Sequence, residues 1–150
     1  DYFKDHQPSA SMTAAGVTGV TVCLAALRDL ERGTAKLRRE LEDRRRGGLV
    51  WLSRNYSMRA VVGDPSSYFR HRDYYWFGFE RAMELNEVEL LQGRDWFFEG
   101  AQIMLGLQRS DGSWDGSLEA TCFCVLFLKK AVSGPVVPIL QRPITPGGRR

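Results

Sequence analysis

Five stretches of this chain repeat their apolar residues at the spacing of an α-helix, and clusters of glycine, proline, aspartate and serine separate them. This alternation is the strongest constraint on the fold, because each breaker cluster ends one helix before the next begins. The expected helices span about 11–29, 49–61, 73–85, 95–107 and 117–131. Ser11 is the expected N-cap of the first, and the second opens after Gly47-Gly48. The sequence therefore predicts an all-α fold.

The expected helices differ in how deeply they are buried. The first carries small residues at Ala14, Ala15, Gly16 and Gly19, which indicate a close neighbour. The fourth is expected to bury six apolar side chains, namely Trp96, Phe97, Ala101, Met104, Leu105 and Leu107. The fifth is apolar nearly all round, which is typical of a helix covered on every side.

The stretch 28–46 holds eight basic and five acidic residues with almost no large apolar ones. One interpretation is a basic patch that binds phosphate or an anionic surface. The other is a solvated helix extension or loop, and the interleaved signs favour it.

Composition narrows the class of protein. The chain has 150 residues, 43% of them apolar, which suits one soluble domain with a packed core. A net charge of +3 is too small to argue for nucleic-acid binding, and no apolar run is long enough for a membrane span. The cysteines are three, Cys23, Cys122 and Cys124, and we expect them to be buried free thiols in a reducing compartment, which favours the cytoplasm. Cys122 and Cys124 are expected on opposite faces of one helix.

The alternation of helices resembles about two and a half helical hairpins, followed by a Pro/Gly-rich tail at 133–150. Between the fourth and fifth helices, Gln108, Gly112 and Trp114 stand at Q-x3-G-x-W spacing after the apolar stretch from Gly100 to Leu107. This segment resembles the QW repeat of the squalene/hopene cyclase and prenyltransferase-like family. The glutamine and the tryptophan are expected to fasten one hairpin to the next, because a helix end leaves backbone groups without partners.

The resemblance implies a partial α/α-toroid over 1–132, the C-terminal part of a larger ring, with an isoprenoid or another apolar chain as its ligand. Because half a ring leaves helix faces open, self-association or a missing N-terminal half is expected as the partner. Cyclases of the family carry a DxDD acid motif, which does not occur here. Its protein prenyltransferases use an Asp/Cys/His zinc site, and neither His6 nor His71 lies near a cysteine at a ligand spacing. We expect no metal and no cofactor.

The aromatic third helix is the segment most open to a functional interpretation. Tyr74, Tyr75 and Phe79 are candidates to line a cavity for an apolar or cationic group, with Asp73 beside them. The alternative for these rings is core packing between helices. Glu80 and Glu84 are candidate acids, but at this spacing they are more typical of a solvated face or of pairing with Arg81.

Three functions remain open from the sequence. The first is a repeat unit that is not catalytic by itself and binds an apolar chain. The second is an isoprenoid cyclase or transferase whose catalytic acid lies in a missing N-terminal half. The third is a helical repeat scaffold that binds protein partners.

Overall fold

The computed structural model describes residues 8–29, 34–63 and 72–131 and confirms an all-α fold. The tail at 133–150, His6 and His71 lie outside these residues. The described part holds five α-helices and a two-stranded ribbon. These are α1 (Ala10–Ala26), α2 (Ala35–Arg54), α3 (Arg72–Leu85), β1 (Leu90–Leu91), β2 (Arg94–Asp95), α4 (Trp96–Leu107) and α5 (Leu118–Leu128), with single 3-10 turns at Leu27–Asp29 and Lys129–Ala131.

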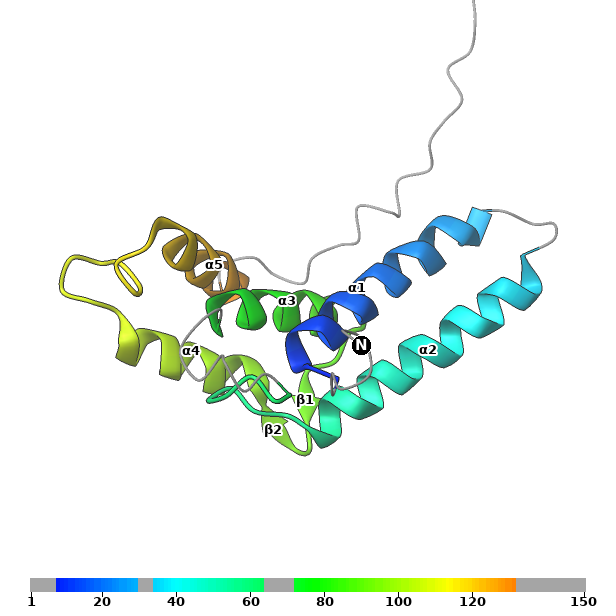
Figure 1. The fold of residues 1–150 in the computed structure, drawn as a ribbon, viewed down its shortest axis with the longest axis horizontal. Coiled ribbons are helices and arrows are strands. Elements are labelled where there is room, and N and C mark those ends of the chain that lie inside the picture. The colour runs from blue at the N-terminus through cyan, green and yellow to red at the C-terminus, as the bar shows by residue number, and fades with distance from the viewer. Residues whose placement is uncertain (1–7, 30–33, 64–71, 132–150) are drawn as a thin grey trace, which may run out of the picture.

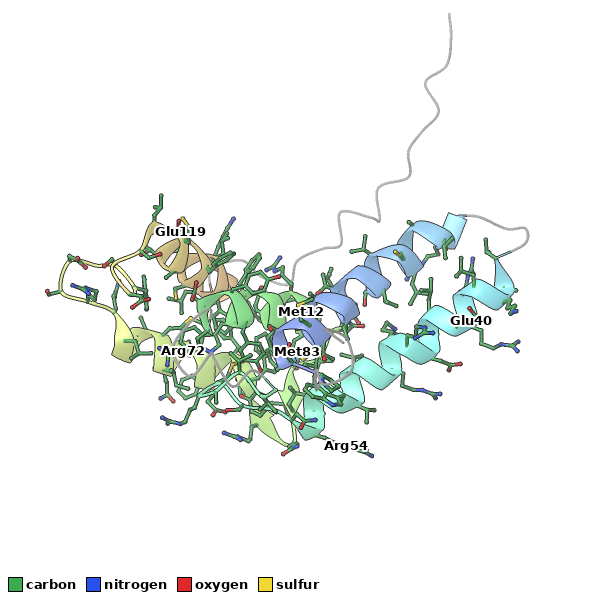
Figure 2. The ribbon with its side chains drawn as sticks, viewed as in Figure 1. Met12, Glu40, Arg54, Arg72, Met83 and Glu119 are labelled. Atoms are coloured by element: carbon green, nitrogen blue, oxygen red, sulfur yellow. The ribbon has the colours of Figure 1, made fainter. Side chains whose placement is uncertain are left out.

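Helix α3 lies between two helical hairpins (Figure 1). On one side α1 packs against both α2 and α3, and on the other side α5 packs against α3. Side chains crowd together around α3, where Met83 is fully buried, whereas Arg54 at the end of α2 points into solvent (Figure 2). Whether these hairpins belong to a closed ring stays a prediction.

Aromatic rings form the centre of the core. The Phe79 ring, which is fully buried, contacts the rings of Tyr75 and Trp96 at centroid distances of 5.6 and 5.8 Å. Trp96 in turn contacts Phe127 of α5. The indole nitrogen of Trp76 donates a hydrogen bond to the Met58 carbonyl, which satisfies its polar atom inside the core. Core packing, the alternative for this aromatic run, is therefore what the structure shows for its buried members.

The expected bounds of the second helix, 49–61, are wrong at both ends, because α2 also ends earlier, at Arg54. Helix α2 begins at Ala35, twelve residues before the Gly47-Gly48 pair, and both glycines lie inside it. The polar first half of this helix is solvated, as the alternation of charges in 28–46 predicted. Ion pairs along its surface, such as Arg45–Glu42 and Arg46–Asp43, stabilise it. The two glycines do not end the helix. Gly48 is needed inside it, because the chain packs closely on α1 at this position. A Cβ atom there would lie 2.5 Å from the Cγ2 atom of Val17.

The first helix begins two residues earlier than expected. Ser9, not Ser11, is its N-cap, and the Ser9 hydroxyl accepts a hydrogen bond from the Met12 amide. The small residues of this helix also make fewer close contacts with a neighbouring helix than the sequence predicted. Ala14 is fully buried, whereas Cβ atoms at Gly16 and Gly19 would meet open space.

The fourth and fifth helices begin within one residue of the expected positions 95 and 117, and each has a capping side chain. The Asp95 carboxylate accepts from the Phe98 amide, and the Ser117 hydroxyl accepts from the Ala120 amide. The ribbon before α4 was not expected from the sequence. Its two-residue loop is Gln92-Gly93, and both residues have positive φ, as a tight hairpin turn requires.

Apolar side chains on α4 and α5 are more exposed than predicted. Leu105 and Leu107 of α4 are 59% and 42% exposed, and α5 is not covered on every side, since Leu118 is 77% exposed and Val125 52%. The reason is that, within the described residues, α5 packs mainly on the face toward α3 and more lightly on the face toward α4. Because α5 is apolar on all its faces, its sequence could not show which of these faces would be covered by a neighbour and which would stay exposed.

Candidate functional site

A hollow of about 310 Å³ lies where the connection between α4 and α5 faces the first turn of α3. We call it the turn hollow. Three segments supply its walls: the start of α3, the end of α4 with the Q-x3-G-x-W turn, and the inner face of α5. The lining residues are Arg72, Asp73, Trp76, Leu107, Arg109, Trp114, Asp115, Ala120 and Cys124.

The Q-x3-G-x-W turn closes on itself. The Gln108 side-chain amide donates to the Gly112 carbonyl at 3.0 Å, and the Arg109 amide donates to the Ser113 carbonyl at 2.9 Å. Gly112 has φ +83°, a conformation that other residues rarely adopt. The glutamine thus closes its own loop, and among the described residues it does not reach the next helix as the fastening interpretation proposed.

Trp114 ties this turn to the helices on both sides. Its indole nitrogen donates to the Met104 carbonyl at 2.8 Å, one of the last carbonyls of α4, which lack a partner within the helix. Its backbone amide donates to the Thr121 hydroxyl in the first turns of α5. With only 6% of its surface exposed, Trp114 is the residue that joins α4 to α5.

The floor of the turn hollow is apolar and its rim is charged. The indoles of Trp76 and Trp114 are buried, and Leu107 adds a half-exposed aliphatic wall. The Arg72 guanidinium lies 4.7 Å from the centroid of the Trp76 ring, where a cation is attracted by the face of the ring. Arg109, Asp73 and Asp115 complete the rim. This combination suits a ligand with an apolar body.

Cys124 lies at the bottom of the turn hollow as a protonated thiol. Burial raises its pKa to about 12, the nearby Asp73 carboxylate adds to that increase, and Arg72 opposes it. A thiol with such a pKa holds its proton at neutral pH and is a poor nucleophile. Cys124 therefore contributes surface to the hollow and no reactive thiolate.

The structure separates the four candidate residues of the third helix. Tyr75 and Phe79 are buried in the core, and the Tyr75 hydroxyl donates to the Ser57 carbonyl. Tyr74 is half-exposed, with its ring edge on Phe123. Asp73 lies on the rim of the turn hollow, beside the Q-x3-G-x-W turn. The hollow thus unites Asp73 with the repeat motif and does not include the three aromatic candidates.

The two glutamates of α3 take part in ion pairs. Glu80 is fully buried and accepts a hydrogen bond from the Arg81 Nε atom at 2.5 Å, so of the two expected alternatives it takes the pairing with Arg81 and not the solvated face. Burial raises the pKa of Glu80, while the Arg81 hydrogen bond opposes the rise. Glu84 pairs with Lys130. The first pair lies within α3, and the second connects α3 with the 3-10 turn that follows α5, away from the turn hollow.

Sequence reasoning missed most of the residues that line the turn hollow. Cys124 had a signal, since Ala120, Cys124 and Phe127 are the buried residues of α5 and recur at helical spacing. Arg109 lies inside the motif, directly after Gln108, but the motif spacing assigns no role to that position. Arg72 had no signal, because no spacing in the chain connects the start of α3 with a turn almost forty residues later.

Comparison with known proteins gives no match, whether to a protein-family model, to a curated protein or to a solved structure. Among residues 8–29, 34–63 and 72–131, no group of three or more histidine, cysteine or acidic residues is placed to hold a metal ion. In the same part of the chain, no helix has both the length and the apolar character needed to cross a membrane.

The cysteines give a direct test of the packing around this hollow. Cys23 and Cys122 are exposed, against the expectation that all three are buried, and Cys124 faces the opposite way from Cys122, as predicted. At about pH 8 an aromatic disulfide reagent is expected to modify these two thiols quickly. Cys124 should react at least about a hundredfold more slowly, because it is buried and protonated. Equal rates for all three thiols in the folded protein would contradict this packing, and unfolded protein gives the reference rate.

Proposed function

We propose that this chain is a helical-hairpin repeat unit of the squalene/hopene cyclase and prenyltransferase-like class, which binds an isoprenoid or another long apolar chain in the turn hollow and is not catalytic by itself. The observation that carries the proposal is the position of the hollow. Its apolar floor is built on Trp114, the tryptophan of the Q-x3-G-x-W turn, together with Trp76 from α3. The motif and the binding surface are then the same part of the molecule.

The size and lining of the turn hollow support an apolar ligand. Its volume of about 310 Å³ is at the lower end of the range for small-molecule sites, which are mostly lined by hydrophobic and aromatic groups. Leu107, which remains half-exposed at its edge, would gain burial when an aliphatic chain binds.

The chemistry of the hollow supports binding over reaction. Cyclisation of an isoprenoid needs an acid that acts in a water-excluded cavity, and Asp73 lies on an open rim with Arg72 and Arg109. Prenyl transfer to a thiol needs a thiolate, and Cys124 keeps its proton. The enzyme hypothesis therefore depends on groups supplied from elsewhere in a larger protein.

A scaffold that binds protein partners is a second candidate, favoured by the open apolar surface of the second hairpin. Phe98 and Leu105 of α4 and Leu118 and Val125 of α5 are all more than half exposed. Surfaces of this kind are usually covered by a neighbouring repeat or by another chain. Light scattering that shows a monomer at high concentration, together with a lack of binding by a hydrophobic dye, would contradict this second function.

Titration of the chain with farnesol, followed by tryptophan fluorescence, tests the proposed function. Leu107→Asp is expected to weaken binding by about tenfold or more, since a charged group replaces an aliphatic wall of the hollow. Leu105→Asp is the matched control: it changes a more exposed leucine of the same helix that does not line the hollow, and it should bind as the unchanged chain does.

Equal weakening in the two variants, or no binding at all, would contradict the proposal. A parallel incubation with squalene, or with a prenyl diphosphate and Mg²⁺ or Zn²⁺, is expected to give no product by mass analysis. Turnover that is lost in Asp73→Asn or in Tyr75→Phe would instead establish the enzyme hypothesis.

A further inference from the structure

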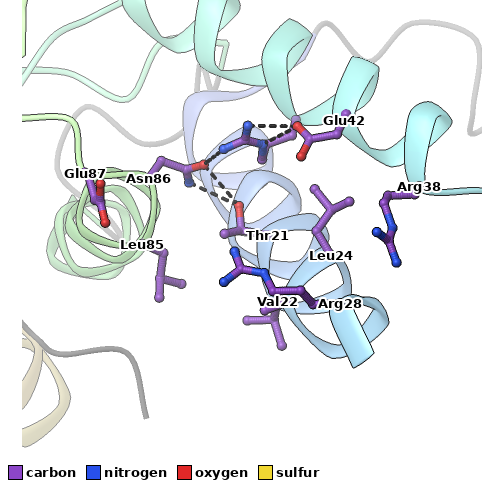
Figure 3. Close-up of a pocket in the computed structure, with 11 residues that line it drawn as sticks. Thr21, Val22, Leu24, Arg28, Arg38, Glu42, Leu85, Asn86 and Glu87 are labelled. Atoms are coloured by element: carbon purple, nitrogen blue, oxygen red, sulfur yellow. Dashed lines mark hydrogen bonds and ion pairs between the residues drawn. The ribbon is translucent and has the colours of Figure 1, made fainter. Parts of the chain in front are cut away.

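A second hollow, of about 380 Å³, lies at the opposite end of α3 from the turn hollow. We call it the arginine hollow (Figure 3). One stripe of α1, the facing stripe of α2 and the end of α3 line it. The lining residues are Thr21, Val22, Leu24, Ala25, Arg28, Arg38, Glu42, Arg45, Leu85, Asn86 and Glu87. Because α3 has 14 residues, the two hollows are roughly 20 Å apart and cannot share one small ligand.

A polar network holds the inner wall of the arginine hollow in place. Arg45 of α2 donates to the Asn86 side-chain oxygen at 2.8 Å and to Glu42 at 2.9 Å. The Asn86 amide nitrogen donates to the Thr21 hydroxyl of α1. Figure 3 shows these side chains meeting between the three elements. The wall is therefore fixed by bonds among α1, α2 and the residue that follows α3.

Further arginines line the arginine hollow beyond this network. Glu42 is already paired with Arg45, whereas Arg28 has no hydrogen bond or ion pair within the described residues. Arg38 also lines the hollow, and one of its N–H groups is donated to the Leu27 carbonyl. An adjoining hollow shares Arg28, Arg38 and Glu42 and adds Arg39. Arg28, in the 3-10 turn after α1, and Arg38, in α2, thus line one space together, and Glu87 is a further charged residue of its lining.

The other wall of the arginine hollow is aliphatic. Val22 is about half exposed, and Leu24, Ala25 and Leu85 lie beside it. A free inorganic anion would leave these side chains in water. An anion that carries a short apolar group would cover them, which adds a favourable contribution from buried apolar area.

We propose that the arginine hollow binds a small organic phosphate, with the phosphate group on Arg28 and Arg38 and the apolar part on Val22 and Leu85. Arginine suits this ligand because its planar guanidinium donates two parallel hydrogen bonds to phosphate oxygens. Arg39, which lines the adjoining hollow, adds a further positive charge beside this site. This site is independent of the turn hollow, and its failure would leave the proposed function intact.

Isothermal titration calorimetry with inorganic phosphate and with hexyl phosphate tests this site at low ionic strength. Hexyl phosphate is expected to bind more tightly than phosphate. Arg28→Gln is expected to weaken hexyl phosphate binding by about tenfold, the loss expected for a charged hydrogen bond. Arg44→Gln is the matched control, since Arg44 is an exposed arginine of α2 that lines neither hollow, and its affinity should change by less than about twofold.

A third arm distinguishes a soluble ester from a lipid headgroup. Vesicles that contain phosphatidic acid are expected to bind less tightly than hexyl phosphate, because the hollow encloses the phosphate between helices. Three results would overturn the proposal: no binding of hexyl phosphate, equal losses in Arg28→Gln and Arg44→Gln, or binding to vesicles alone. Circular dichroism of each variant confirms that it is folded.

Discussion

Replacing Trp114 with alanine is expected to lower the free energy of unfolding by about 3 kcal/mol or more, as for other buried aromatic truncations. The change removes a nearly buried indole and leaves the Met104 carbonyl without its hydrogen-bond donor. Both losses fall on the join between α4 and α5. For a domain of this size the thermal midpoint, followed by circular dichroism, should fall by roughly 10 °C.

Phe98→Ala serves as the control for this substitution. Phe98 is also a large aromatic residue of α4, but it is 60% exposed, so its truncation should change stability by no more than about 0.5 kcal/mol. Trp114→Phe is expected to fall between the two, because it keeps most of the ring and loses the N–H group. A Trp114→Ala midpoint equal to that of the unchanged protein would show that Trp114 does not join the two helices.

Gly48→Leu is expected to destabilise the chain by at least about 3 kcal/mol or to prevent its folding. A Cβ atom alone would already lie 2.5 Å from the Val17 Cγ2 atom, so a larger side chain must separate α1 from α2. Gly47→Leu is the matched control, because a Cβ atom at Gly47 meets open space. There the better helix propensity of leucine should stabilise α2 by up to about 1 kcal/mol. Urea unfolding of both variants measures the difference.

The smaller change Gly48→Ala identifies the contact responsible. Combining it with Val17→Ala removes the methyl group that the new Cβ would meet, so the two substitutions should cost less together than the sum of their separate costs. Additive costs, or equal effects of leucine at positions 47 and 48, would contradict the close packing of α1 on α2.

The sequence was sufficient to predict the helical class and most helix ends, because these depend on local chemistry. Helices α4 and α5 begin within one residue of the expected positions 95 and 117, where Asp95 and Ser117 cap them, since a short polar side chain needs only the amides of the next turn. The start of α2 could not be predicted in the same way. Gly47-Gly48 has the composition of a breaker, and only the neighbouring helix shows why a glycine belongs inside a helix at position 48.

The candidate site was predictable in part. The motif residue Trp114 and the acidic residue Asp73 were both identified from the chain, but their proximity was not, because it depends on how α3 packs against α5. For Tyr75 and Phe79 the prediction of a cavity lining was wrong. An aromatic run has the same composition whether its rings line a cavity or fill a core, and burial decides between the two.

The central position of α3 makes the two ends of the molecule depend on one helix. Tyr75 and Trp76 hold the segment that follows α2 through hydrogen bonds to Ser57 and Met58, while Phe79 holds Trp96 at the start of α4. Neither hairpin can bury its inner face until α3 is in place. The chain should therefore lose its structure in one concerted transition, so that damage at the α4–α5 turn weakens the distant pair α1–α2 as well.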